Sequence, residues 1–566
     1  MSQQREKKAF LYFALIIGFI LINLTAAQFY SRIDLTKEKR HSLSEASRRL
    51  ISQLDDVVYV KVYLEGDFPA GFTRLRNATE DVLEEFKAFH ADHFAFEFIN
   101  PFEGADEKET KAIFAQLQKK GLTPTRIDNI EQTSVQNQYI FPGALISYQG
   151  EEVAVKLLQS QLGVSPSQAL NNSVSGLEYA LISGIKQLVY KDKPRVGIVT
   201  GHGELDGQKM ADFITSLQEF YRVQKLETDS LIEIPSVFTS LIIAKPTQTF
   251  SEQEKYKIDQ YIMRGGNVLW LIDQMIADMD SLKGKAAFAV TPRELNLEDQ
   301  FFQYGARINS NVVQDMQCAP HPFVTGYNGN IPQQQLFDWI FYPVIVPQSK
   351  HPIVNNMDAI IQKFPSSIDT VGAPNIKKQG LLHTSKYSRN IFTGARVSLD
   401  VIQNKPQPGQ FNKPYQMTAV LLEGKFNSLY GSRAGNSFVK SIEAATGSSF
   451  RKQSSGAKQI IVADGDMVEN SFDRQGNMYP AGFYPYTGNT FANKKFLMNS
   501  VEYLSDPSGI MEANAKSVTM RPLDTTRIKR EKTKWQMINL FIPILLIVLF
   551  GITYNYIRFR KYKSIE

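Results

Sequence analysis

Cysteine is almost absent from this chain of 566 residues, which contains Cys318 and no other. A lone cysteine excludes an intramolecular disulfide and a Cys-x-x-Cys redox motif. Disulfide content therefore says nothing about the compartment in which the protein works.

Several motifs of enzyme chemistry are also missing. The chain has no Gly-x-x-x-x-Gly-Lys-[Ser/Thr] sequence, so it does not hydrolyse ATP through a phosphate-binding loop of that type. It also lacks the Gly-x-Ser-x-Gly elbow of serine hydrolases. Cys318 lies in the loop-like stretch DMQCAPHPF rather than on the strand-to-helix elbow that a cysteine nucleophile needs. Cys318 and His321 alone are too few ligands to indicate a metal site.

The chain carries no strong charge of either sign. Its net charge is +6, and the basic residues are spread out except near the two ends, so we predict no nucleic-acid partner. The mean hydropathy of −0.24 excludes a polytopic membrane protein. With 43% hydrophobic and 21% charged residues, most of the chain is expected to be folded and exposed to water.

Two long uncharged runs lie near the ends of the chain. Residues 9–30 and 535–557 contain no Asp, Glu, Lys or Arg and are 22 and 23 residues long. At about 1.5 Å per residue, each is long enough to span a hydrocarbon core of about 30 Å. Aromatic residues that suit the membrane interfaces lie in both runs: Tyr12, Tyr30, Trp535, Tyr554 and Tyr556. The sequence therefore predicts one transmembrane helix at each terminus.

Two other interpretations of these runs are disfavoured. A buried core helix is disfavoured because charge-free runs of this length occur at both ends. A cleaved signal peptide fits the residues TAA before Gln28, but the first run is longer than the usual apolar region of about 7–15 residues. An uncleaved anchor is favoured.

Two spans place both short tails, residues 1–8 and 558–566, on one side of the membrane and residues 31–534 on the other. Basic residues flank the spans on both sides, so a charge count alone does not decide the orientation. Because long translocated domains largely escape the positive-inside rule, the basic tails favour cytoplasmic termini and an extracytoplasmic main domain. Residues 506–534 are interpreted as a polar juxtamembrane stalk.

Residues 31–190 predict an N-terminal α/β domain. A strand at residues 57–66 is followed by a helix with apolar residues at spacings of three and four, and then by a strand at residues 94–101. This order suggests parallel pairing of the two strands. The domain resembles a thioredoxin-like half without its redox motif.

Residues 191–505 predict a doubly wound, Rossmann- or flavodoxin-like α/β domain. Buried strands are expected at residues 196–200, 240–246, 267–273 and from residue 459. Ser251 and Glu254 form a capping box at the start of a helix that Gly265 ends. Residues of roughly 320–455, rich in Pro, Gly and aromatics, interrupt this domain as a β-rich insertion whose topology is not assigned.

The loop after the first of these strands reads VGIVTGHGELDG. Gly201, Gly203 and Gly207 are spaced Gly-x-Gly-x-x-x-Gly, one residue longer than the dinucleotide fingerprint. Glu204 and Asp206 would also place negative charge where a pyrophosphate binds, so we predict no nucleotide and no other cofactor. The loop is interpreted as architectural.

The carboxyl ends of parallel strands usually form the ligand crevice of such a domain. Five side chains are expected at this edge and make up the candidate crevice: His202, Glu204, Asp273, Asp464 and Asp466. The alternative interpretation is a solvated acidic rim with no function. No catalytic residue or metal ligand is assigned.

Five segments resemble, in order, the gliding-motility-associated ABC-transporter auxiliary proteins, often called the substrate-binding component of that transporter. They are SRIDLTKEKRHSLSEASRRLISQLDDVVYVKVYLEGDFPAGFTRL, GIVTGHGEL, FSEQEKYKIDQYIMRGGNVLWLID, LNLEDQFFQYGARINSNVVQD and AVLLEGKFNSLYGSR. The resemblance runs over nearly the whole chain, including both terminal runs.

The resemblance implies an anchored subunit of the cytoplasmic (inner) membrane that works with a permease and a separate ATPase in gliding motility and associated export. It supplies no catalytic residues. Polar Asn23 and Asn539 lie within the predicted spans, and we expect them to contact each other or a permease helix. Two alternatives stay open: a glycan- or peptide-binding anchored module without a transporter, and a membrane-tethered hydrolase that uses the acidic crevice.

Overall fold

The structure of the chain is a computed structural model that describes residues 17–19, 42–128, 137–159, 166–190, 192–205, 207–404, 406–433, 437–473, 475–506, 508–515 and 525–563. The chain forms two compact units, Met1–Val518 and Thr519–Glu566. Helices and strands are mixed along the first unit, which confirms the predicted α/β class at that level.

The first part of the chain contains a four-stranded sheet with the order β2-β1-β5-β6. Strands β1 (Val58–Val62) and β2 (Phe94–Phe98) pair in parallel, as their strand-helix-strand order predicted, and α3 (Ala70–Phe89) connects them. Strand β5 (Gly143–Tyr148) is antiparallel to β1 and forms a hairpin with β6 (Glu151–Lys156). The other elements are α2 (Glu45–Ser52), α4 (Glu107–Lys119), β3 (Thr125–Asp128), β4 (Asn137–Ile140), α5 (Pro166–Ser175) and α6 (Leu177–Val189).

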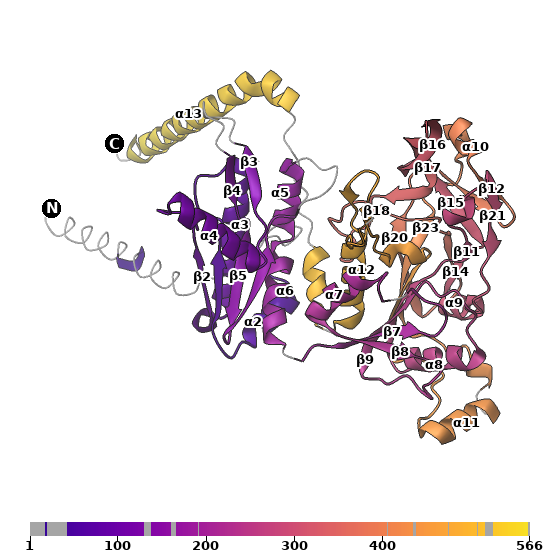
Figure 1. The fold of residues 1–566 in the computed structure, drawn as a ribbon. Helices are drawn as coiled ribbons and strands as arrows, with labels where there is room; N and C mark the ends of the chain where they lie inside the picture. Colours follow the sequence, from indigo (N-terminus) through magenta and orange to yellow (C-terminus); the bar gives the residue numbers. More distant parts are fainter. Residues whose placement is uncertain are drawn as a thin grey trace. The chain divides into compact units, whose positions relative to one another are not determined.

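The larger sheet has seven strands in the order β20-β23-β24-β10-β9-β7-β8 (Figure 1). Its members are β7 (Arg195–Thr200), β8 (Arg222–Glu227), β9 (Phe238–Ala244), β10 (Asn267–Leu271), β20 (Ile376–His383), β23 (Met417–Gly424) and β24 (Ala457–Val462). Strands β8, β7, β9, β10 and β24 are parallel, and β23 and β20 are added in antiparallel pairing. Numbered along the chain, the parallel strands lie in the order 2-1-3-4-5, which is the order of flavodoxin-like sheets.

Both faces of this sheet are buried. Alternate residues of one strand enter different cores: Leu241 and Ile243 of β9 pack with α8 (Glu252–Met263), whereas Ile242 packs with α7 (Ala211–Phe220) and α12 (Asn493–Ser505). Burial on both sides explains why the central strands read as nearly continuous apolar runs. Polar side chains are therefore concentrated at the ends of these strands.

The segment between β10 and β24 supplies two strands of the sheet itself. Strands β20 and β23 lie within residues 320–455, the range predicted as an insertion. The rest of the segment has its own core around Trp339, Phe341 and Phe364. Its strands and helices are β11 (Met275–Ile276), β12 (Ala287–Ala289), β13 (Thr291–Pro292), α9 (Glu298–Tyr304), β14 (Ala306–Ile308), β15 (Asn311–Asp315), β16 (Cys318–Asn328), β17 (Ile331–Ile345), β18 (Ile360–Ile361), β19 (Ile368–Thr370), β21 (Ser388–Phe392), β22 (Arg396–Ser398), α10 (Asp400–Gln403) and α11 (Ser437–Thr446).

The second unit contains the long helix α13 (Thr525–Lys563). Within the residues that the structure describes, one helical stretch, Arg530–Arg560, is long and apolar enough to cross a membrane by length and composition. The predicted span at residues 535–557 lies inside it, and Asn539 is exposed on α13. The predicted span at residues 9–30 lies outside the described residues except for residues 17–19, and so does Asn23.

The glycine-rich loop after β7 is held by backbone contacts. The carbonyl oxygen of His202 accepts hydrogen bonds from the N–H groups of Thr247 and Gln248, both at 2.8 Å. Gly203 has a φ of +70°, and a Cβ at this position would lie 2.1 Å from Oγ1 of Thr247. The loop therefore packs against the segment after β9, which supports an architectural role.

We expect Gly203→Ala to destabilise the protein, because the new Cβ meets both an unfavourable φ and the Thr247 hydroxyl. The strained backbone alone costs about 1–3 kcal/mol. Urea unfolding of the full chain in detergent measures the effect. Gly207→Ala is the matched control, because its Cβ would find only the flexible end of Lys225, at 3.5 Å, and no positive φ is involved. Equal stability of the two variants would contradict the packing described for the loop.

Candidate functional site

The carboxyl ends of three parallel strands carry the five polar residues that the sequence singled out for a ligand crevice. His202 and Glu204 follow β7, Asp273 follows β10, and Asp464 and Asp466 follow β24. Strand β9 adds Lys245, which the sequence reasoning did not select. These residues divide into two separate groups, an aspartate cluster and a histidine group.

The aspartate cluster consists of Asp273, Asp464 and Asp466, whose carboxylate oxygens lie within 4.8 Å of one another. Asp464 is fully buried, and the side chains of Asp273 and Asp466 are each 10% exposed. The backbone fixes these carboxylates: Asp273 accepts the N–H of Gly465 at 2.5 Å, and Asp464 accepts that of Asp466 at 2.9 Å. The structure thus brings three of the five predicted residues together, but in the interior rather than on a solvated rim.

Lys245 neutralises this cluster. Its ammonium group lies 3.3 Å from Oδ2 of Asp273 and forms a closer ion pair with Asp466. The backbone of Lys245 has a positive φ of 52°, which is uncommon for a residue with a side chain. The backbone N–H of Lys363 also donates to Oδ2 of Asp464, at 2.8 Å.

The pKa values of the cluster reflect burial and charge. Burial together with repulsion from Asp466 raises the pKa of Asp273 to about 6, and burial with its carboxylate neighbours also raises the pKa of Asp464. Burial opposes the charge of Asp466, but Lys363 and Lys245 outweigh it and lower the pKa of that carboxyl group. Asp273 and Asp464 are therefore the carboxyl groups of the cluster that retain a proton most readily.

The three carboxylates are enough in number and close enough together to hold a hard divalent cation. In this structure the ammonium group of Lys245 is paired with two of the three carboxylates, so a metal ion would have to displace it. The same pairing restrains both Asp273 and Asp466 from acting as a general base. We interpret the cluster as a buried ion-pair network that ties the ends of β9, β10 and β24 together.

The histidine group contains His202, Glu204 and Glu254. Nδ1 of His202 lies 3.2 Å from Glu204, Nε2 lies 3.0 Å from Glu254, and the ring stacks on Phe250 with centroids 3.7 Å apart. Burial opposes protonation of His202, but the two carboxylates outweigh it and raise its pKa. Both carboxylates lie within ion-pair distance of the ring, so the arrangement favours the charged imidazolium.

Glu254 links this group to helix α8. It belongs to the capping box predicted from the sequence, in which the Ser251 hydroxyl accepts the N–H of Glu254 and the Glu254 carboxylate accepts the N–H of Ser251. Both bonds are present, and Gly265 follows the end of the helix with a φ of +96°, as expected. Sequence reasoning recognised Glu254 as a cap but not as a partner of His202. Asp206 lies outside the described residues.

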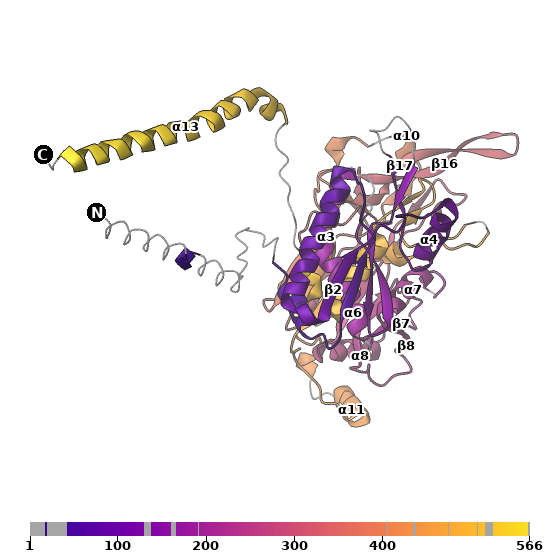
Figure 2. The ribbon, with the colours of Figure 1, turned by 90° about the vertical axis from the view of Figure 1, so that its left-hand side faces the viewer.

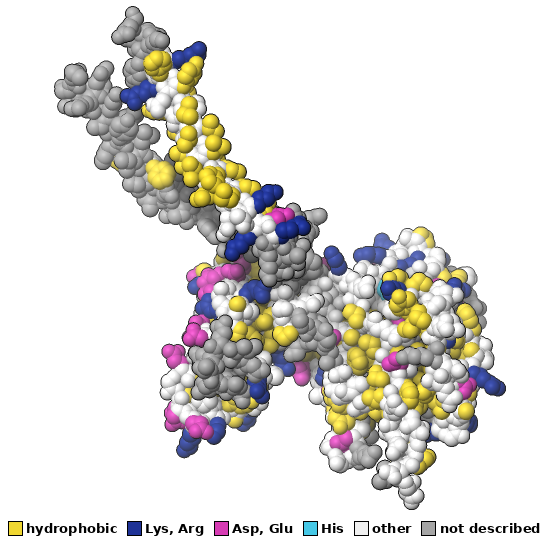
Figure 3. All heavy atoms as spheres, turned by 90° about the horizontal axis from the view of Figure 1, so that it is seen from above, with side chains coloured by type: hydrophobic (Ala, Val, Ile, Leu, Met, Phe, Trp, Pro, Cys, Tyr) yellow, Lys and Arg dark blue, Asp and Glu magenta, His cyan; other side chains and the backbone are white. Residues whose placement is uncertain are grey.

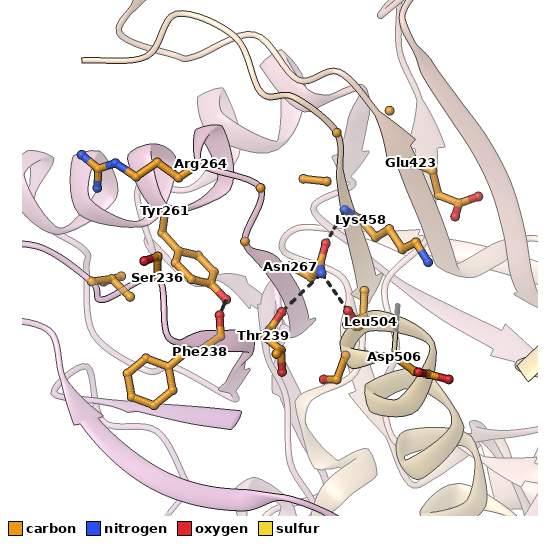
Figure 4. A pocket seen from close by; sticks show the side chains of 17 residues that line it. Ser236, Phe238, Thr239, Tyr261, Arg264, Asn267, Glu423, Lys458, Leu504 and Asp506 are labelled. Atoms are coloured by element: carbon orange, nitrogen blue, oxygen red, sulfur yellow. Dashed lines mark hydrogen bonds between the residues drawn. The ribbon is translucent and has the colours of Figure 1, made fainter. Parts of the chain in front are cut away.

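Two cavities lie away from the predicted residues. One, of about 540 Å³, lies at the amino ends of β9, β10 and β24 (Figure 4). There Asn267 donates to the carbonyl oxygens of Thr239 and Leu504, and Tyr261 donates to that of Phe238, so the polar groups at the centre of this cavity hold the fold together. The other, of about 900 Å³, lies beside α9 and β15 and is lined by Arg307, Asn309 and Phe392 among others.

We expect Lys245→Met to destabilise the protein by about 3–5 kcal/mol, because removing one partner of a buried ion pair leaves charge uncompensated. The same variant should gain thermal stability from added Mn²⁺, whereas the native chain should not, because Lys245 already fills the place of the cation. Lys283→Met is the control, since its pair with Asp280 is on the surface, with the two side chains 76% and 78% exposed, and such pairs contribute little to stability. Stabilisation of the native chain by Mn²⁺ would instead show that the aspartates bind metal.

Comparison with known proteins places the chain in a family. The family model for the auxiliary proteins of an ABC-type uncharacterized transport system matches residues 193–500, and a domain of unknown function matches residues 37–147. An uncharacterized protein of Borreliella burgdorferi is 22% identical over 557 residues, which cover 96% of each chain.

Among solved structures, the N-terminal domain of mmIFT52 is 13% identical, with a TM-score of 0.31 over 55% of this chain and 97% of that one, a likeness too low to support an argument. The family match covers all seven strands of the central sheet and includes both groups at its carboxyl edge. The chain belongs to the auxiliary proteins of ABC-type uncharacterized transport systems.

Proposed function

We propose that the protein is a non-enzymatic, membrane-anchored auxiliary subunit of an ABC transporter that supports gliding motility and associated export. The observation that carries this proposal is the family match over residues 193–500. The anchor rests on helix α13, the orientation on the basic tails, and the process on the resemblance of five sequence segments to the gliding-motility family.

Helix α13 supports the proposed anchor. Its apolar side chains remain widely exposed, for example Ile547 at 71% and Phe550 at 72%. A helix with an uncharged run of 23 residues, 535–557, whose side chains are unburied within their own unit is suited to a lipid environment. Figure 3 shows apolar side chains along this helix with Lys and Arg near both ends, which is the pattern of a membrane span with its flanks.

The separate ATPase follows from what the sequence lacks. Without a phosphate-binding loop motif the chain needs another subunit to hydrolyse ATP, and with at most two spans it needs a permease to form a pathway. We place the main domain on the extracytoplasmic side of the inner membrane, where it can meet cargo. Asn539, exposed on α13, stays the predicted contact to a permease helix, together with Asn23.

The non-enzymatic role is favoured by the aspartate cluster. A hydrolase would need a carboxylate free to act on substrate, whereas Asp273 and Asp466 are paired with Lys245 and nearly buried. The cavity of about 900 Å³ keeps the runner-up open: its lining combines amide side chains with Phe302 and Phe392, which are 56% and 64% exposed, and it has room for a glycan or peptide.

We expect the full chain, tagged and extracted in mild detergent, to co-purify with one permease and one ATPase subunit. ATP hydrolysis by the complex should disappear when the phosphate-binding lysine of the ATPase subunit is changed. It should persist with Asp273→Asn in this chain, because that residue holds no role in the reaction. Purification of the chain without either subunit from its native membrane would favour the binding module instead.

Membrane labelling tests the orientation. In a Cys318→Ser background, a membrane-impermeant maleimide applied to intact spheroplasts should label Ser310→Cys and spare Ser564→Cys. Ser310 suits this purpose because it is exposed in the main domain, and position 564 lies in the predicted cytoplasmic tail. Permeabilised cells, in which both positions should react, provide the control. The reverse pattern would place the domain in the cytoplasm and favour the tethered hydrolase.

A further inference from the structure

Strands β16 and β17 form a hairpin that extends beyond the rest of its domain (Figure 2). Its base is packed, with Trp339 and Phe341 in a core. We call residues 324–336 the arm. Within the arm the backbone turns at Gly329, which has a φ of +61°, and Val324, Tyr327 and Leu336 are 49%, 71% and 46% exposed.

The arm has no described partner of its own. Among the strands that the structure describes, β16 pairs only with β17, and the pairing of β17 with β18 is confined to Val344 and Ile345 at the base. A two-stranded ribbon exposed on both faces is only marginally stable in water. An arm of this kind gains most from a surface that pairs with its edge or covers a face.

The chemistry of the arm limits what that surface is. From Cys318 to Phe337 the chain has no Asp, Glu, Lys or Arg, although 21% of the whole chain is charged. A hydrocarbon interior is excluded, because both edges of the ribbon carry backbone groups that lipid cannot satisfy. The edge of β16 is the better of the two for strand pairing, since residues 323–328 contain neither charge nor proline, whereas Pro332 interrupts β17. The pairing of β16 with β17 is irregular between Val324 and Gly326, so the regular part of this edge is short.

We propose that this edge pairs with the same edge of a second copy of the chain. In an interface with two-fold symmetry, residues near the axis face their own copies, so any charge there meets a like charge. A charge-free edge avoids that repulsion. Antiparallel pairing of two β16 edges joins the two arms into one four-stranded ribbon and satisfies backbone groups that are otherwise exposed.

The contact is small, because a stable interface in solution buries about 1,200–2,000 Å² and a strand pair of this length buries less. Pairing therefore depends on copies being held close together, which α13 provides if it anchors the chain as proposed. To that extent the inference rests on the proposed function, and it needs neither the permease nor the ATPase.

Cysteine scanning in native membranes tests the pairing. In the Cys318→Ser background, single cysteines are placed at each position from Val324 to Asn328 and oxidised with copper phenanthroline. Two-fold pairing predicts a disulfide-linked dimer that is strongest at one position and declines on both sides of it, because Cα atoms more than about 7 Å apart do not form a disulfide. Absence of a dimer at all five positions would overturn the proposal.

A charge placed on the arm supplies the second test. A lysine placed one residue from the strongest cysteine position should lower the cross-linked fraction about tenfold, because the two new ammonium groups then lie close together across the two-fold axis. Val237→Lys is the matched control, since Val237 is 47% exposed and lies outside the arm. An equal yield from both lysine variants, or a disulfide to a different protein, would contradict pairing of two copies. Loss of permease co-purification with intact cross-linking would reject the transporter role and leave the pairing standing.

Discussion

The carboxyl edge of the central sheet depends on the ion pairs that Lys245 forms with Asp273 and Asp466. The sheet is buried on both faces, so polar groups are confined to the ends of its strands. Three aspartates converge at one such end, and they would repel one another in a nearly dry environment without a cation. The lysine that follows β9 supplies that cation from within the chain. The edge is therefore a buried ion-pair network that links three neighbouring strands, and not an open acidic crevice.

This ion-pair network changes which surface of the domain is expected to bind a ligand. In open α/β sheets, ligands usually bind outside the carboxyl ends of the strands. Here that edge is occupied by the lysine and aspartates, and beside it by the His202 imidazole between Glu204 and Glu254. Both groups connect neighbouring segments of the fold. Surfaces away from this edge are therefore the better candidates for contact with cargo or with other subunits.

Two features outside the central sheet, helix α13 and the β16–β17 arm, expose surfaces of opposite kinds. Helix α13 exposes a continuous apolar surface, which is unfavourable in water and favourable in a bilayer. The β16–β17 arm exposes an uncharged ribbon, which is unfavourable in a bilayer and is stabilised by pairing with another strand. Both features suit the proposed role, in which the protein associates with a membrane and with other chains.

The sequence by itself determined those features whose physical cause is local. Continuous apolar runs identified β7, β9, β10 and β24, the Ser251–Glu254 capping box and Gly265 identified α8, and length without charge identified the apolar stretch of α13. The mostly polar edge strand β8 gave no such signal. Strands β20 and β23 were assigned to an insertion because β23 joins the sheet through β24, which follows it at a distance in the chain, and β20 joins through β23. Sequence also placed Asp273, Asp464 and Asp466 at one edge, since carboxyl ends of parallel strands share it. Only the tertiary structure decided that they are buried and that Lys245 neutralises them, because burial and charge pairing depend on which residues of distant segments meet.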